Sequence, residues 1–228
     1  MSVPVVGRRA GAAVLITAAV LFVLYPAVRP WADETTVAGA TGSMSSGAWV
    51  AAHIFAMIGF ILVPLGLLAV ADAVGGTRGA TPARFAVLSG WVGAGLTLAY
   101  YGAEDFGLHA IGAAAVDGAA GLDLLALVEA VRFGSAQATM FTLGLLLLGI
   151  AGVLTAVAVW RSGVLPRYAG VPFAVGFALL IPQFFGPAAI RIGHGVLLAA
   201  GLGWLGLALW TVRTSDRRGR SDAPTRVP

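Results

Sequence analysis

Apolar residues in this chain gather in six long runs separated by shorter polar segments. The runs cover about residues 10–28, 48–71, 85–103, 137–160, 168–186 and 190–212. Each is close to the ~20 residues that a helix needs to cross the ~30 Å hydrocarbon core of a bilayer. The pattern predicts an all-α fold, a polytopic transmembrane bundle of six spans in one domain over residues 1–212. The polar, proline-containing segment 213–228 is expected to be a disordered tail.

The six runs can be grouped into three hairpins. The first, third and fifth runs start behind Arg9, Arg84 and Arg167, in each case followed by small residues. Each hairpin supplies one histidine to its far end. Parallel repeats of this kind occur in transporters. Sequence rich in Ala, Gly and Leu also produces such similarity by composition alone, so both interpretations stay open.

The distribution of arginine predicts the orientation in the membrane. One side of the runs holds eleven of the fourteen basic residues, namely Arg8, Arg9, Arg78, Arg84, Arg161, Arg167, Arg213, Arg217, Arg218, Arg220 and Arg226. The other side holds Arg29, Arg132 and Arg191 together with seven of the ten acidic residues. Because positive charge collects on the cytoplasmic side, both termini are expected in the cytoplasm of a bacterial inner-membrane protein. The first run is longer than a typical signal-peptide core, so we expect it to be retained.

Composition supports the membrane class and excludes several kinds of chemistry. Hydrophobic residues make up 59% of the chain and charged residues 11%, with a mean hydropathy of +0.92, which is too apolar for an ordinary soluble domain. The absence of cysteine excludes disulfides and thiolate metal sites. The absence of lysine excludes the usual phosphate-binding loop. The net charge of +4 comes from arginines beside apolar runs, so a lipid bilayer is the expected partner and nucleic acid is not.

Two segments on the acid-rich side are long enough to carry structure or a site. Residues 29–47 are rich in Thr, Gly and Ser and are expected to form a flexible loop. Residues 104–136 place Leu122, Leu125 and Val128 at helical spacing, which predicts a short helix on the outer membrane surface.

Polar residues at the outer ends of the third, fifth and sixth runs are candidates for a binding site. If the third helix continues past its run, Tyr101, Asp105 and His109 share one face. The candidate binding residues are Tyr101, Glu104, Asp105, Gln183 and Arg191. A simpler interpretation also stays open. Glu104 and Asp105 then mark only where water begins, and Arg191 pairs with one of them or with a lipid phosphate.

The three histidines are candidate metal ligands. His53 and His194 each lie 19 residues from a charged residue at the inner end of their run, or ~28 Å along a helix, so both are expected at one depth near the outer boundary. His109 follows Glu104 and Asp105 at the same level. Three histidines and a carboxylate suit zinc, iron or copper, and two histidines suit haem. No metal-binding spacing such as His-x-x-x-His supports this, so no cofactor is expected by default.

Several short motifs resemble those of small multi-pass membrane proteins of high-GC bacteria. They are Tyr100-Tyr101-Gly102-Ala103-Glu104 with His109, Trp160-Arg161-Ser162-Gly163, Pro182-Gln183-Phe184-Phe185, and Arg191-x-x-His194-Gly195. The resemblance implies a membrane location and six helices over most of residues 10–212. It implies no activity.

Three functional hypotheses follow from these observations. The first is a membrane protein that binds or transports a small molecule or ion at a polar site near the outer face, because ionisable residues from several helices share one depth. The second is a redox protein or enzyme with a metal or haem held by His53, His109 and His194. The third is a structural or accessory membrane subunit without a site.

Overall fold

The computed structural model describes residues 6–212, of which 81% are helical and none are in strands. The α-helices are α1 (Arg8–Val28), α2 (Val37–Met44), α3 (Gly47–Ala73), α4 (Ala80–Gly102), α5 (Leu108–Val116), α6 (Leu124–Phe133), α7 (Ser135–Ser162), α8 (Val171–Ala178) and α9 (Ala188–Thr211). A π-helix, η1 (Ala103–Gly107), joins α4 to α5, and a 3₁₀ helix, η2 (Pro182–Phe185), precedes α9. The predicted disordered tail and its arginines lie outside the described residues.

Four of the helices are long and apolar enough to cross a membrane. They are α1, α3, α7 and α9, with 21, 27, 28 and 24 residues. Their lengths at about 1.5 Å per residue match or exceed the ~30 Å of a hydrocarbon core. Helix α4 has 23 residues and corresponds to the third predicted run, but it is less apolar than these four. The all-helical class is therefore confirmed, and four of the described helices have the length and apolarity that crossing a membrane requires.

The fifth predicted run, residues 168–186, does not form one long helix. Its only α-helix is α8, which has eight residues and ends at Ala178. Pro182 lacks the N–H that would bond to the carbonyl of Ala178 in a continued helix, and its ring would clash with that carbonyl. The chain turns at residues 179–181 and enters η2 instead. The run is apolar, as predicted, but α8 alone is about 12 Å long and cannot cross a bilayer.

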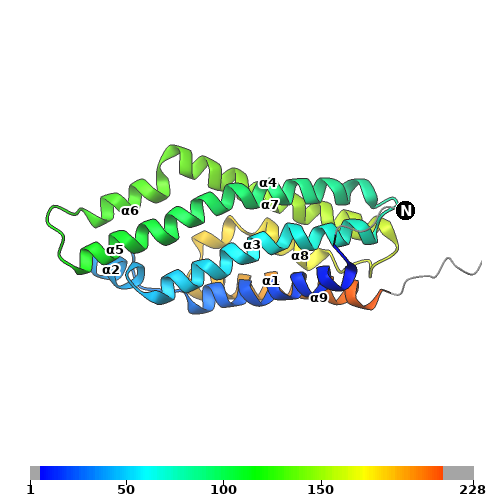
Figure 1. Ribbon diagram of the computed structural model, residues 1–228, viewed down its shortest axis with the longest axis horizontal. Helices are drawn as coiled ribbons and strands as arrows, with labels where there is room; N and C mark the ends of the chain where they lie inside the picture. The colour runs from blue at the N-terminus through cyan, green and yellow to red at the C-terminus, as the bar shows by residue number, and fades with distance from the viewer. Residues whose placement is uncertain (1–5, 213–228) are drawn as a thin grey trace, which may run out of the picture.

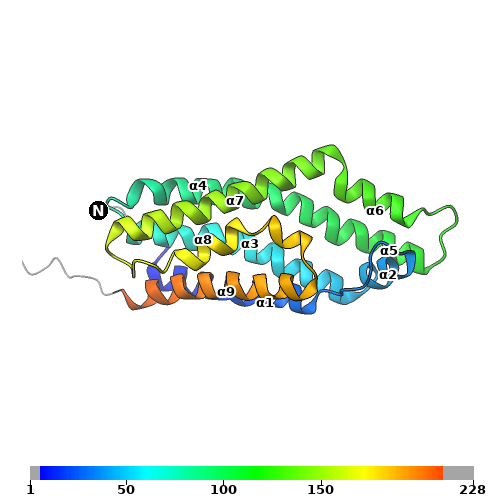
Figure 2. The ribbon, with the colours of Figure 1, turned by 180° about the vertical axis from the view of Figure 1, so that it is seen from behind.

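The long helices and α8 form a closed ring in chain order. Helix α1 packs on α3, α3 on α4, α4 on α7, α7 on α8, α8 on α9, and α9 returns to α1. Figures 1 and 2 show this bundle from its two sides, with α8 between α7 and α9 in the half nearer the N-terminus. The core inside the ring is apolar and partly aromatic, with Phe22 in edge contact with Phe60 and Phe177.

Helices α4 and α7 approach each other closely at two glycines. A Cβ atom on Gly93 would lie 2.8 Å from the carbonyl oxygen of Gly144 and 2.9 Å from the amide nitrogen of Leu148. Ser89, one turn before Gly93, donates a hydrogen bond of 2.7 Å to the carbonyl of Leu147. Small residues at such crossings let helix backbones pack directly in lipid.

Helix α4 continues through η1 into α5 without a break, so residues 80–116 form one long rod. Helices α2 and α6 pack against α5, the far end of this rod, and the three helices form a cap at the end of the bundle away from the N-terminus, which we call the outer cap (Figure 1). The cap has its own small core of Ala40, Met44, Trp49, Leu108, Leu124 and Val128. The prediction of a flexible loop at 29–47 was wrong for the part that forms α2. Thr36 caps this helix by accepting a hydrogen bond from the N–H of Gly39. The helix predicted around residues 122–132 is present as α6.

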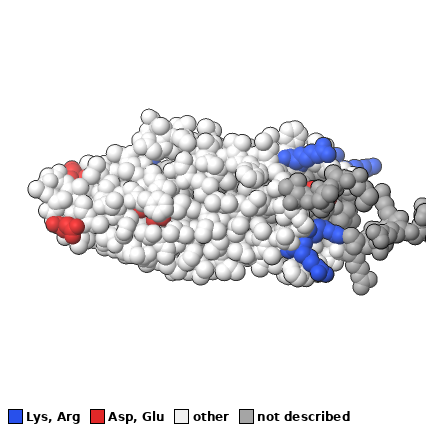
Figure 3. Space-filling model, in the orientation of Figure 1, with Lys and Arg blue, Asp and Glu red and all other residues white. Residues whose placement is uncertain are grey.

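Charge is divided between the two ends of the bundle. In Figure 3, the basic side chains gather at the end where the N-terminus lies, and acidic side chains lie mainly toward the outer cap. The division agrees with the arginine pattern along the sequence. The face with α4 and α7 between these ends exposes large apolar side chains such as Leu88, Trp91 and Leu146.

Candidate functional site

A cavity of about 650 Å³ lies between the outer halves of α7 and α9, under the segment that follows α1. We call it the outer cavity. Its volume is in the range of small-molecule sites, which are mostly apolar with a few polar groups. Its charged lining residues are Arg29, Glu34, Glu104, Arg132 and Arg191, and its aromatic ones are Tyr25, Trp31, Tyr100, Phe133, Phe141, Phe184 and Phe185.

Four of the charged residues form a continuous chain of ion pairs along one wall. Arg29 contacts Glu34 at 2.7 Å, Arg132 contacts Glu34 at 2.7 Å, and Arg132 also contacts Glu104 at 3.0 Å. The chain connects the segment after α1, the π-helix η1 and helix α6. All four side chains are at least 85% buried, with exposed fractions of 7–15%. Pairs shielded from water in this way couple more strongly than pairs on a surface.

The ion pairs keep Glu104 and Arg132 charged despite their burial. Burial is the largest single influence and would raise the pKa of the Glu104 carboxyl, but Arg132, His53 and Arg29 together outweigh it and the pKa is lowered. For Arg132, burial would lower the pKa of the guanidinium, and Glu104 and Glu34 together raise it instead. We conclude that this wall is ionised and electrically balanced, with two positive and two negative groups.

Arg191 lies apart from this chain of ion pairs. Its Nη2 donates to the carbonyl of Phe184 at 2.5 Å and its Nε to that of Gly186 at 3.2 Å. Its guanidinium also lies 5.4 Å from the ring centre of Trp31. The hypothesis that Arg191 pairs with Glu104 or Asp105 was therefore wrong for this structure, because Glu104 is bound to Arg132. Among the described residues, Arg191 forms no ion pair.

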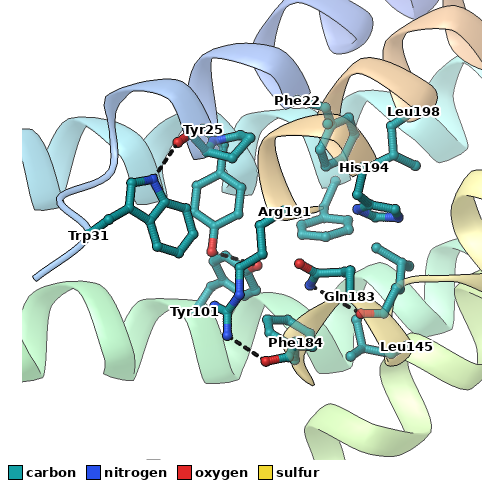
Figure 4. A pocket seen from close by; sticks show the side chains of 14 residues that line it. Phe22, Tyr25, Trp31, Tyr101, Leu145, Gln183, Phe184, Arg191, His194 and Leu198 are labelled. Carbon is teal, nitrogen blue, oxygen red and sulfur yellow. Dashed lines mark hydrogen bonds between the residues drawn. The ribbon is translucent and has the colours of Figure 1, made fainter. Parts of the chain in front are cut away.

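A smaller pocket of about 30 Å³ continues from the outer cavity into the bundle. The two share Tyr25, Trp31, Leu145, Phe184 and Arg191 in their walls. In Figure 4, Arg191 extends between Trp31 and Phe184, with Gln183 and His194 on the deeper side. The volume is enough for about one water molecule. The candidate residues Tyr101, Gln183 and Arg191 are thus brought together, although Tyr101 and Gln183 line only the small pocket.

Tyr101 belongs to an aromatic cluster at this depth. Its hydroxyl donates to that of Tyr25 at 3.4 Å, and the ring centres lie 5.9 Å apart. The ring of His53 lies 5.6 Å from Tyr25 and 4.3 Å from Trp49. The cluster joins α1, α3 and α4 directly below the ion-paired wall.

Each histidine makes a hydrogen bond to a backbone carbonyl. His53 Nδ1 donates to Trp49 at 2.8 Å, His109 Nδ1 to Met44 at 2.7 Å, and His194 Nε2 to Gly176 at 2.7 Å. The last two bonds connect α5 to α2 and α9 to α8. Within residues 6–212 no group of three or more His, Asp or Glu side chains is placed to hold a metal ion. The structure therefore gives the three histidines three separate packing positions.

Asp105 lies outside the outer cavity, in the π-helix η1. Its side chain is fully buried, and neither carboxylate oxygen has a hydrogen-bond partner among the described residues. Burial raises the pKa of the carboxyl from its ordinary 3.8 to about 6, although nearby His109 opposes the change. Asp105 and His109 are thus near each other, as the four-residue spacing predicted, but Asp105 does not contact Arg191.

The raised pKa of Asp105 predicts a pH-dependent effect of its replacement. Well below pH 4 the carboxyl is protonated in both folded and unfolded states, so the raised pKa has no effect on stability. As pH rises from about 4 to about 6 the unfolded chain loses this proton while the folded chain keeps it, so stability falls, and above pH 6 the loss is complete. Asp105→Asn should therefore stabilise the protein by about 1–3 kcal/mol at pH 8 and much less at pH 4. Thermal unfolding in detergent at the two pH values measures the difference. Asp117→Asn, at an exposed residue, is the control, and an equal gain at both pH values would contradict the prediction.

Sequence reasoning missed Arg29, Glu34, Trp31 and Arg132 as site residues. The distribution of arginine along the sequence could have identified three of the residues that line the cavity. The three arginines on the acid-rich side, Arg29, Arg132 and Arg191, are the exceptions to the positive-inside distribution, and all three line the outer cavity. Buried ionisable groups are costly unless they are paired, and Arg29 and Arg132 are both buried and paired, so arginines that depart from the positive-inside distribution are candidates for a site.

Comparison with known proteins gives no further guide to this site. No family model matches the chain, and neither a curated protein nor a solved structure matches it.

Proposed function

We propose that this chain is an inner-membrane protein whose outer cavity binds a small anionic molecule from the outer side. In this proposal the chain crosses the membrane six times, and the fifth crossing consists of α8 together with residues 179–187. The arginine-rich end of the bundle, with both termini of the chain, faces the cytoplasm in this proposal. The outer cap then projects from the outer surface, and the outer cavity lies where the bundle enters the cap.

The charge of the outer cavity is the observation that carries the proposal. Arg29, Glu34, Arg132 and Glu104 balance one another through their ion pairs, which leaves the charge of Arg191 in excess. The guanidinium is held by two carbonyls and has donors left for a ligand, since an arginine carries five N–H groups. A preformed cavity with one uncompensated cation favours an anion.

A cysteine-protection experiment tests both the orientation and the binding. The chain has no cysteine, so Thr142→Cys in the cavity wall gives a single reactive thiol. We expect it to react with a membrane-impermeant maleimide added outside spheroplasts, whereas Arg161→Cys, at the other end of α7, reacts only after permeabilisation. In detergent, phenyl phosphate should slow the labelling of Thr142→Cys saturably, and Arg191→Gln should weaken that protection at least tenfold.

The matched control is Leu143→Cys, one residue along α7 and 49% exposed on the bundle surface. Its labelling should not respond to phenyl phosphate. Labelling of Arg161→Cys from the outside would reverse the orientation. Equal protection of Thr142→Cys and Leu143→Cys, or no protection of either, would overturn the binding proposal.

A further inference from the structure

The short length of α8 opens the outer cavity sideways. Helices α7 and α9 are neighbours in the ring only through α8, which ends at Ala178. Beyond that residue the space between α7 and α9 holds η2 and the turn that follows it, and the outer cavity lies there. Its walls are residues 138–145 of α7 on one side and residues 181–191 on the other. A full-length helix in place of α8 would fill this level, whereas here exposed Thr142 on α7 and exposed Phe185 on η2 lie on the two sides of the cavity, so it is open between them.

Apolar side chains border the opening on both sides. Phe185, in η2, is 88% exposed, and Phe133, at the end of α6, is 64% exposed. Phe141 and Phe184 lie deeper in the same cavity, with ring centres 5.6 Å apart. Aromatic side chains are enriched where a membrane protein meets the boundary between lipid and water. In the proposed orientation the opening lies at the level where the headgroups of the outer leaflet meet its acyl chains.

The polar part of the outer cavity lies behind these rings. Arg191 sits between the aromatic rings of Trp31 and Phe184, at 5.4 and 5.5 Å from their centres. Arginine binds phosphate oxygens through its planar fork of N–H donors. An apolar entrance open to lipid, with one cation in excess behind it, matches a molecule that has an acyl chain and a single negative phosphate.

From this arrangement we propose that the outer cavity takes an anionic phospholipid from the outer leaflet, with its phosphate on Arg191 and an acyl chain in the opening between α7 and η2. This deepens the proposed function and rests on it. The shared chemistry is a phosphate group, which a lipid headgroup or a free phosphate ester supplies. Basic pockets between membrane helices recognise lipid headgroups in this way.

Native mass spectrometry of the purified protein with added lipid tests the proposal. We expect one dioleoyl phosphatidylglycerol to be retained per chain, with at least tenfold weaker retention of dioleoyl phosphatidylcholine. Arg191→Gln should weaken phosphatidylglycerol retention at least tenfold. Arg161→Gln removes the same charge at the opposite end and should leave it unchanged. Thr142→Trp, which narrows the lateral opening, should reduce lipid retention but leave the protein folded, since Thr142 is exposed.

The outcomes separate the lipid proposal from the proposed function. Retention of both lipids alike, or equal losses in Arg191→Gln and Arg161→Gln, would overturn the lipid proposal. Protection of Thr142→Cys by phenyl phosphate without lipid retention would show a site for soluble anions, so the lipid proposal would fail and the proposed function would stand. Absence of both effects would overturn both.

Discussion

Replacing Arg132 with methionine should lower the free energy of unfolding by about 3–5 kcal/mol. The guanidinium is the only link between Glu34 and Glu104 in the described chain of ion pairs. Methionine keeps much of the apolar stem of arginine but leaves the buried carboxylate of Glu104 without its partner, whereas Glu34 keeps its ion pair with Arg29. The loss comes mainly from the stranded charge of Glu104, and thermal or denaturant unfolding in detergent measures it.

A double-mutant cycle isolates this effect from lost packing. Glu104→Gln in the Arg132→Met background removes the stranded charge, so it should recover part of the lost stability instead of adding to the loss. Arg161→Met, at an exposed arginine on the other end of the bundle, should cost only about 0–1 kcal/mol. Additive losses for Arg132→Met and Glu104→Gln would mean that the ion pair contributes little.

Gly93→Ala should destabilise the bundle by about 1–3 kcal/mol, although alanine is a better helix former than glycine. The added Cβ would lie 2.8 Å from the carbonyl oxygen of Gly144 and 2.9 Å from the amide nitrogen of Leu148. Both are backbone atoms, so the clash cannot be relieved by a side-chain rotation and α4 must move away from α7. Thermal unfolding in detergent is the measurement.

Gly95→Ala is the matched control on the same helix. A Cβ on Gly95 has no atom within 4 Å, so only the helix preference changes and stability should stay equal or rise by up to ~1 kcal/mol. A loss at Gly95 as large as at Gly93 would show that glycine in α4 is needed for another reason than the contact with α7.

Hydropathy predicted the long helices well because a spanning helix must be apolar over a fixed length. The helices α1, α3, α4, α7 and α9 begin and end within a few residues of the predicted runs. It failed at residues 168–186 because apolarity alone does not tell whether a helix can continue. Pro182 cannot bond to the carbonyl of Ala178, where α8 ends, whereas α3 continues through Pro64, and hydropathy does not distinguish these two cases.

The sequence indicated the level of the candidate site along the bundle but not the ion pairs that its residues form. Glu104 and Arg191 do line one cavity near the outer end, as their level in the sequence indicated. Their partners come from segments that carry no periodic signal. Glu34 lies after α1, and Arg132 is brought to it by α6, 98 residues later in the chain. The depth of a residue follows from the rise per residue along its own helix. Its lateral contacts depend on how the helices pack against one another, and residue spacing within one run does not predict that packing.

The unbroken rod of residues 80–116 limits how far the outer cap can move relative to the bundle. At about 1.5 Å per residue it is roughly 55 Å long, which exceeds the ~30 Å hydrocarbon core by more than half. The cap is therefore an extension of a helix clamped inside the bundle, and no linker joins the two along this rod. Its movement relative to the bundle is limited to bending of the rod and is resisted by the ion pairs between Glu104 and Arg132. A cavity framed in this way is preorganised, so a ligand loses little of its binding energy to ordering the protein.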